Sequence, residues 1–272
     1  MDIANIAFAI ALVTLVGILG AVILVLAAKY MHVEEDPRIA QVTECLPGAN
    51  CGGCGYAGCA DYAKAVVEGG APVNKCAVGG AAAAAKIAEV MGVEAGASVK
   101  TWAVVGCQGE NGVCNAKFDY QGMTSCAAAA QLFGGPNACA FGCIGLGDCV
   151  KACPFDAIHV VNGKARVDVD KCVGCGACKA ACPKKIIWMH SEPKKPVVMC
   201  AIHEMGGKVM KECTAGCIGC HLCEKVCPKE AIKVINNVAR IDYDKCVGCG
   251  LCVNKCPKHV IKMPKEIKEQ NL

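Results

Sequence analysis

Cysteine is the residue type that gives this chain most of its capacity for chemistry. Of its 272 residues, 26 are cysteine, whereas aromatic residues make up only 4%. With so few large apolar side chains, hydrophobic burial alone cannot hold the chain together, so crosslinks through metal or disulfides are expected. A reducing compartment favours metal, and an oxidising one would favour disulfides.

Three cysteine runs share one tight spacing. The pattern C-x2-C-x2-C-x3-C-P begins at Cys172, Cys217 and Cys246. In this bacterial ferredoxin spacing, three thiolates bind one [4Fe–4S] cube and the fourth binds the cube of a partner run. Zinc does not require four thiolates at this spacing followed by proline. The runs therefore predict paired iron–sulfur clusters, and the first run needs an upstream partner.

That partner is present in altered form, as Cys139-x3-Cys143-x5-Cys149-x3-Cys153-Pro154. Cys153 and Cys227 lie 74 residues apart (227 − 153), and the same offset relates the later runs, which indicates two ferredoxin-like units in tandem. Leu146 stands where the second unit has Cys220, so we expect Cys139 to replace the missing ligand. The predicted ligand sets are Cys139, Cys143, Cys149 and Cys182; Cys153, Cys172, Cys175 and Cys178; Cys217, Cys220, Cys223 and Cys256; and Cys227, Cys246, Cys249 and Cys252.

An N-terminal cluster is predicted at Cys51, Cys54, Cys59 and Cys76, where three close thiolates and one distant thiolate suit a single cube. Structural zinc more often uses two separated C-x2-C pairs. Cys45 lies outside this pattern and is expected to be a buried free thiol.

Five further cysteines flank the first unit: Cys107, Cys114, Cys126, Cys200 and Cys213. A sixth cluster would need four of them, and we expect Cys107, Cys126, Cys200 and Cys213, with Cys114 left out. Buried free thiols are the alternative, and so is a different sharing that involves Cys139.

The elements that must position these thiols form an α+β protein. Helices are expected at 60–68 and at 80–91, the second ending at Gly92. The connectors AIHVVNGKARVDVDKC and AIKVINNVARIDYDKC each predict a β-hairpin. The expected domains are a membrane anchor at 1–30, a small helical [4Fe–4S] domain at 31–93, and ferredoxin-like (βαβ-type) units with two clusters each at 94–199 and 200–272.

Residues 3–28 contain no charge, and about 20 such residues suffice to cross a bilayer. A cleaved signal peptide would need a positive N-terminal region and a shorter apolar stretch. Lys29, His32 and Arg38 follow the segment, against Asp2 before it, which predicts a single-pass cell-membrane protein with its soluble part in the cytoplasm. A reducing cytoplasm favours metal over disulfides. Gly17 and Gly20 would permit close approach of another helix.

Other chemistries find little support in the sequence. A net charge of +4 argues against a nucleic-acid-binding protein, and no dinucleotide or phosphate-loop motif occurs. No histidine has an evident catalytic partner, so no catalytic side chains are expected; His221 could tune a cluster, although a solvent-facing turn residue is favoured. The C-terminal half carries several lysines that form a solvated face or steer an acidic electron carrier: Lys184, Lys185, Lys194, Lys195, Lys208, Lys211, Lys225 and Lys229.

The anchor, the CGGCGYAGC motif with its distant Cys76, and the ferredoxin-type runs together resemble the B subunit of the Rnf complex, the ion-translocating ferredoxin:NAD oxidoreductase. The resemblance covers almost the whole chain. It implies that the chain accepts electrons from reduced ferredoxin and relays them through [4Fe–4S] clusters to membrane partner subunits, coupled to Na⁺ or H⁺ transport. Flavin and NAD sites would belong to those other subunits. Shorter family members carry one ferredoxin-like unit, so the extra unit leaves the order of the electron path open.

Three alternatives remain. An iron–sulfur subunit of another membrane enzyme, such as a hydrogenase or a formate-linked system, would share the same chemistry. A zinc-stapled membrane scaffold would have no redox role. Corrinoid iron–sulfur proteins share a motif similar to CGGCGYAGC, but no region long enough for a corrinoid barrel follows it here.

Overall fold

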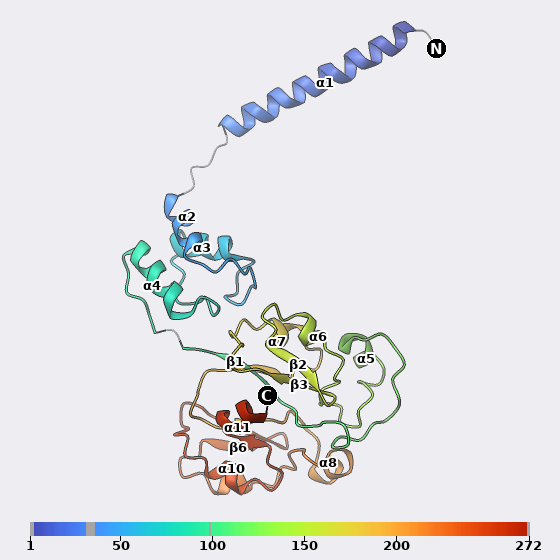
Figure 1. The fold of residues 1–272 in the computed structure, drawn as a ribbon, viewed down its shortest axis with the longest axis vertical. Coiled ribbons are helices and arrows are strands. Elements are labelled where there is room, and N and C mark those ends of the chain that lie inside the picture. Colours follow the sequence, from blue (N-terminus) through green and yellow to red (C-terminus); the bar gives the residue numbers. More distant parts are fainter. Residues whose placement is uncertain (1–2, 31–35, 98, 271–272) are drawn as a thin grey trace.

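The computed structural model describes residues 3–30, 36–97 and 99–270, which form a mixed α and β protein (Figure 1). The helices are α1 (Ile3–Tyr30), α2 (Pro37–Glu44), α3 (Cys59–Val67), α4 (Gly80–Met91), α5 (Cys126–Gln131), α6 (Asp148–Lys151), α7 (Ala177–Ala181), α8 (Gly206–Glu212), α9 (Leu222–Lys225), α10 (Leu251–Lys255) and α11 (Pro264–Gln270). The strands are β1 (Trp102–Val105), β2 (Ile158–Val161), β3 (Lys164–Val167), β4 (Ile187–His190), β5 (Val197–Val198), β6 (Ile232–Ile235), β7 (Val238–Ile241) and β8 (Ile261–Lys262).

Helix α1 covers the apolar segment that was expected to span a membrane. It is 28 residues long, and the side chains described at 11–26 are all exposed. Among the residues described, however, the structure contains no helix with the length and apolar character required for a membrane crossing. Asp2 and His32, used to predict the orientation, lie outside the described residues.

Helices α2, α3 and α4 form a small domain with its own core. Val42, Tyr62 and Ile87 are at most 1% exposed and join the three helices. Helix α4 ends at Gly92, whose left-handed φ of 65° closes the helix without a Cβ penalty. The two helices expected in this region are confirmed.

The remainder consists of two units built on the same plan. Each contains an antiparallel hairpin, β2–β3 in the first unit and β6–β7 in the second. Both hairpins are confirmed, and each element of the second hairpin lies 74 residues after its counterpart. The short helices α6 and α7 recur at the same offset as α9 and α10. The internal repeat is therefore a repeat of structure.

Each unit contains a second two-stranded sheet. In it, a strand that precedes the unit's first cysteine run pairs with a strand that follows its last run. Strand β1 pairs antiparallel with β4, and β5 pairs antiparallel with β8. All pairs among the named strands are therefore antiparallel, which corrects the expectation of βαβ-type units, since those require parallel strands. Cys107 and Cys200 follow β1 and β5 two residues after each strand ends. The sheets therefore bring two cysteines that lie outside the ferredoxin runs close to the units.

The cores of both units contain thiols among aliphatic side chains. The first core combines Val104, Ile158 and Ile187 with Cys143 and Cys172. The second likewise surrounds Cys217 and Cys252 with aliphatic residues from β6, β7 and β8. Groups held by these thiols would occupy the places that aromatic side chains fill in ordinary cores, in keeping with the low aromatic content.

Candidate metal-cluster sites

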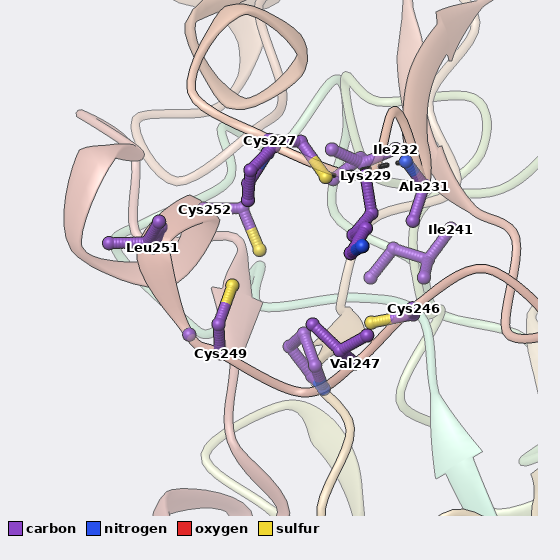
Figure 2. A pocket seen from close by; sticks show the side chains of 13 residues that line it. Cys227, Lys229, Ala231, Ile232, Ile241, Cys246, Val247, Cys249, Leu251 and Cys252 are labelled. Carbon is purple, nitrogen blue, oxygen red and sulfur yellow. Dashed lines mark hydrogen bonds between the residues drawn. The ribbon is translucent and has the colours of Figure 1, made fainter.

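Two cavities in the second unit are each surrounded by four thiols. A cavity of about 380 Å³ is lined by Cys227, Cys246, Cys249 and Cys252. Figure 2 shows these four side chains directed toward a common space between α10 and the hairpin. A second cavity, of about 330 Å³, is lined by Cys217, Cys220, Cys223 and Cys256. In both, three thiols come from one run and the fourth from the other, as the spacing predicts.

The local backbone explains how these thiols converge. Helices α9 and α10, which carry Cys223 and Cys252, each begin after a left-handed residue, His221 at φ 59° and Gly250 at φ 74°. This conformation turns the chain sharply between the second and third cysteines of the run. The backbone N–H of Ala231 donates to Cys227 Sγ over 3.3 Å, the kind of hydrogen bond that tunes a cluster.

The cavities are electrostatically matched to a positively charged iron centre. Burial raises the pKa of Cys223 to about 12, and the nearby Cys217, Cys220 and Cys256 add to the rise. Burial likewise raises the pKa of Cys252 to about 11. Four thiolates around one cavity would repel one another, and bound iron would supply the opposing charge that lets them ionise. The donor set thus fits a [4Fe–4S] cube.

The corresponding cavity in the first unit, of about 340 Å³, is lined by Cys126, Cys143, Cys149 and Cys182. Cys139, which was expected to complete this set, does not line this cavity, and Cys126 lines it instead. Among the causes that raise the pKa of Cys149 to about 12, burial comes first, followed by the nearby Cys143, Cys126 and Cys182.

Asp148 accounts for the position of Cys126. Its Oδ2 accepts hydrogen bonds from the backbone N–H of Ala127, at 2.9 Å, and from Ser125 Oγ, at 3.1 Å. Ser125 is also the N-cap of α5, which begins at Cys126. Since Asp148 starts α6, which carries Cys149, it fixes the beginning of α5 beside that helix. Ser125 before the alanine-rich run was the sequence signal that could have predicted a helix beginning at Cys126.

The second set of the first unit, Cys153, Cys172, Cys175 and Cys178, also comes together. Burial raises the pKa of Cys178 to about 11, and Cys172, Cys175 and Cys153 are the thiols that raise it further. Backbone N–H groups donate to two of the sulfurs, Ala103 to Cys172 at 3.4 Å and Ala157 to Cys153 at 3.5 Å.

A further cavity, of about 380 Å³, gathers cysteines from both units. Four of them are Cys107, Cys139, Cys200 and Cys213, while Cys114 and Cys143 also reach its wall. Cys143 lines the first-unit cavity as well. The structure therefore brings Cys107, Cys200 and Cys213 together as expected for a sixth cluster, and it brings Cys139 there in place of Cys126.

The four thiols of this central cavity form two matching pairs. Cys139 and Cys213 are related by the 74-residue offset. Cys107 and Cys200 occupy equivalent positions, each two residues after a strand, β1 or β5. Cys107 Sγ accepts from the N–H of Cys143 at 3.4 Å, and Cys200 Sγ accepts from the N–H of Cys217 at 3.3 Å. Each unit thus contributes an equivalent pair to a cavity between them.

Cys114 has no counterpart by either criterion, because the offset leads to Trp188 and no cysteine takes an equivalent place beside the second unit's strands. It is half-buried, and a hydrogen bond with Cys213 is the main cause that lowers its pKa. The thiols of the proposed sets surround cavities and are not gathered for a single ion: within the described ranges, no three His, Cys, Asp or Glu side chains are grouped so that they could hold one metal ion.

The N-terminal set lies around the start of α3. The N–H of Cys59 donates to Asn50 Oδ1 at 2.8 Å, and the N–H of Gly79 donates to Cys76 Sγ at 3.3 Å. Tyr62, which is buried, donates to the carbonyl of Pro72 at 2.7 Å and thereby ties the Cys76 segment to α3. Burial raises the pKa of Cys76, with smaller contributions from Cys59, Cys54 and Cys51. Cys45, at the end of α2, packs at the edge of the domain core.

Other residues considered from the sequence have surface or structural positions. His221 is exposed, and its Nδ1 lies 2.8 Å from Glu224 Oε2, which agrees with a turn residue. Lys184 binds the carbonyls of Gly134 and Ala140. Two more lysines form ion pairs, Lys195 with Glu192 and Lys208 with Glu204. Lys185, Lys194, Lys211, Lys225 and Lys229 are exposed or partly exposed.

Known protein families match the regions that carry these sites. A family model for an iron–sulfur cluster matches residues 46–78. Models of the 4Fe-4S dicluster domain match residues 136–183, 171–231 and 214–263. Together these matches cover the N-terminal motif and all four cysteine runs.

Three relatives are similar over most of the chain, and each is the B subunit of a translocating complex. That of the Na(+)-translocating ferredoxin:NAD(+) oxidoreductase complex of Acetobacterium woodii is 43% identical over 84% of this chain and 69% of the relative. That of the ion-translocating oxidoreductase complex of Methanosarcina acetivorans is 43% identical over 87% and 90%. That of the proton-translocating ferredoxin:NAD(+) oxidoreductase complex of Clostridium ljungdahlii is 45% identical over 84% and 81%. The chain therefore belongs to the family of B subunits of the Rnf ion-translocating oxidoreductase complexes.

Proposed function

We propose that this chain is the iron–sulfur subunit that accepts electrons from reduced ferredoxin and relays them toward the membrane subunits of a ferredoxin:NAD oxidoreductase, coupled to Na⁺ or H⁺ transport. The observation that carries the proposal is the series of four-thiol cavities along the chain, in a protein whose relatives include ferredoxin:NAD oxidoreductase subunits. When bound, [4Fe–4S] clusters supply one-electron transfer. NAD and flavin sites would lie on partner subunits.

Six clusters are proposed, each held by four cysteines of this chain. Their ligands would be Cys51, Cys54, Cys59 and Cys76; Cys126, Cys143, Cys149 and Cys182; Cys153, Cys172, Cys175 and Cys178; Cys107, Cys139, Cys200 and Cys213; Cys217, Cys220, Cys223 and Cys256; and Cys227, Cys246, Cys249 and Cys252. The matching pairs in the central cavity support the fourth of these sets, and the position of α5 supports the second.

Ferredoxin would dock on the second unit. All 26 cysteines lie in the described ranges, and of these Cys220 and Cys249 are exposed. Both belong to second-unit cavities, so an external carrier can come closest to a cluster there. Lys225 and Lys229 are exposed near these cavities, and their charge would attract an acidic carrier.

Although no helix among the described residues meets the requirements for a membrane crossing, the uncharged segment 3–28 would attach the chain to the cell membrane as a single-pass anchor, with the soluble part in the cytoplasm. Its described side chains from Leu12 to Leu26 include large apolar groups that are 47% to 71% exposed and have no core of their own. Such surface is costly in water and favourable in lipid. A chain without residues 1–30 should leave the membrane fraction, and its retention there after carbonate washing would contradict the anchor.

The ferredoxin step can be tested by mixing the full chain, purified anaerobically in detergent, with reduced ferredoxin and following cluster bleaching. We expect rapid bleaching that slows as salt rises. K225E/K229E should slow the reaction, whereas the matched control K64E/K86E, on exposed lysines of the N-terminal domain, should not. Intact clusters that ferredoxin does not reduce would contradict the proposed function, and equal slowing by both variants would contradict docking on the second unit.

A further inference from the structure

Gly53 of the N-terminal domain lies directly against Cys175 of the first unit. A Cβ added at Gly53 would lie 2.5 Å from the carbonyl oxygen of Cys175 and 2.9 Å from its Cα. Gly53 belongs to the CGGCG motif between Cys51 and Cys54, and Cys175 is the second cysteine of the run that begins at Cys172. Two backbone turns, each carrying thiols of a different cluster set, are thus in direct contact.

The segment that joins the two domains leads to the same turn. A Cβ at Gly174 would meet Thr101 Oγ1 and the Thr101 carbonyl, so Thr101 lies against the residue before Cys175. Two residues later, the N–H of Ala103 donates to Cys172 Sγ at 3.4 Å. Figure 1 shows a loop of the α2–α4 domain extending toward the end of the first unit that carries α7. The connection and the contact therefore converge on the cluster of Cys153, Cys172, Cys175 and Cys178.

The contact also brings thiols of the N-terminal set close to the Cys175 turn, because Cys51 and Cys54 lie within two residues of Gly53 in the sequence.

We infer that Gly53 is a positioning residue that docks the N-terminal domain on the Cys175 turn, and that electrons cross between the two domains there. One electron would leave the reduced cluster held by Cys153, Cys172, Cys175 and Cys178, which is oxidised, and reduce the cluster held by Cys51, Cys54, Cys59 and Cys76. No bond or proton is exchanged, and reduced ferredoxin supplies the electron. This inference rests on the proposed function and places the N-terminal cluster at the opposite end of the path from the exposed second-unit thiols.

Glycine is required at position 53 because of the neighbouring backbone. The φ of Gly53 lies outside the left-handed region, so alanine would be accepted by the residue's own conformation. The obstacle is the Cys175 main chain, which cannot rotate away as a flexible side chain could. Ordinary contact would need the two turns to separate by about 1 Å. Gly53→Ala should therefore loosen the docking while leaving both domains folded.

The test compares the full-length wild type, Gly53→Ala and the control Gly207→Ala, in which an added Cβ meets nothing within 4 Å. Three quantities are measured: iron per chain, hydrogen exchange of the amides around Cys175, and the electron paramagnetic resonance broadening that arises between neighbouring reduced clusters. A Cys76→Ala variant, which lacks the N-terminal cluster, identifies the part of the broadening that arises between the N-terminal cluster and the cluster of the Cys175 set.

We expect Gly53→Ala to keep its iron, to expose the Cys175 turn to exchange, and to lose the broadening that Cys76→Ala also removes. Reduction of the N-terminal cluster should also slow, because electron transfer becomes slower as the distance between two clusters grows. Wild-type broadening and exchange in Gly53→Ala would overturn the inference, and so would loss of iron from the N-terminal cluster, which would make Gly53 a residue of cluster assembly. In either case normal reduction of the second-unit clusters by ferredoxin would leave the proposed function standing.

Discussion

Cys126 and Cys139 lie in different cavities, and this separation can be measured by counting iron. We predict that Cys126→Ser and Cys139→Ser each lose roughly four iron atoms per chain, and that the double variant loses roughly eight. Cys126→Ser combined with Cys143→Ser should lose only about four, because both thiols belong to one set. A loss of about four from the Cys126/Cys139 double variant would mean that the two thiols share one cluster.

The half-buried thiol of Cys114 is expected to be dispensable for iron binding. Cys114→Ser should retain the wild-type iron content, because Cys107, Cys139, Cys200 and Cys213 already complete a symmetric set. Cys213→Ser is the matched comparison, since its side chain contacts Cys114. If Cys114→Ser loses four irons and Cys213→Ser does not, the roles of the two thiols must be exchanged.

Among the elements, α5 depends on a carboxylate supplied by another helix. Asp148→Ala removes two hydrogen bonds at the start of α5, a loss comparable to that of an N-cap, about 1 kcal/mol. We expect faster iron release from the cavity of Cys126, followed by the absorbance decay under a chelator. Asp170→Ala, which breaks only an exposed ion pair with Lys268, is the control. Equal decay in both variants would mean that Asp148 does not position α5.

The loop after β1 is fixed to the first hairpin by Glu110. Its Oε1 lies 3.1 Å from Lys164 Nζ and 2.6 Å from an Arg166 guanidinium nitrogen, and Lys164 is buried. Burial alone would raise the pKa of Glu110, but hydrogen bonds from Asn162 and Lys164 and the charge of Arg166 outweigh it, so the pKa is lowered.

Because this pKa is lowered on folding, the stabilisation by Glu110 is present above the ordinary pKa of a glutamate and is lost as the pH falls through the lowered value. Glu110→Gln should lower the free energy of unfolding at neutral pH by about 1–2 kcal/mol and weaken iron retention at the nearby Cys107. Chemical denaturation measures the effect, with the exposed Glu89→Gln as control. Identical unfolding of the two variants would mean that Glu110 does not stabilise this loop.

The sequence was sufficient for features that depend on local spacing. The hairpins, the helices after Cys59 and at 80–91, and the four-thiol cavities of the second unit agree with it, because each depends on a short motif. It was insufficient where distant segments meet. The carboxylate of Asp148 accepts from the N–H of Ala127, next to Cys126, across 21 residues, and β1 pairs with β4 across a whole unit. The contact of Gly53 with Cys175 likewise exists only once two domains pack together.

At the scale of the whole molecule, the cluster sites follow the order of the domains. The exposed thiols Cys220 and Cys249 lie in the second unit, the central cavity joins the two units, and Gly53 joins the first unit to the N-terminal domain. This arrangement supports a path from a soluble carrier at the C-terminal unit toward the anchor side of the chain. It also gives the additional unit a role as an extension of the path toward ferredoxin.

The central claim is that this chain is a six-cluster conduit that ferredoxin can reduce. Mössbauer spectroscopy of the iron-57-labelled full chain, frozen before and after mixing with reduced ferredoxin, tests it most directly. We expect roughly 24 iron atoms per chain, all in [4Fe–4S] clusters, of which a part changes to the reduced form on mixing. Bound zinc in place of iron, iron sufficient for five clusters or fewer, or clusters that ferredoxin leaves fully oxidised would contradict it.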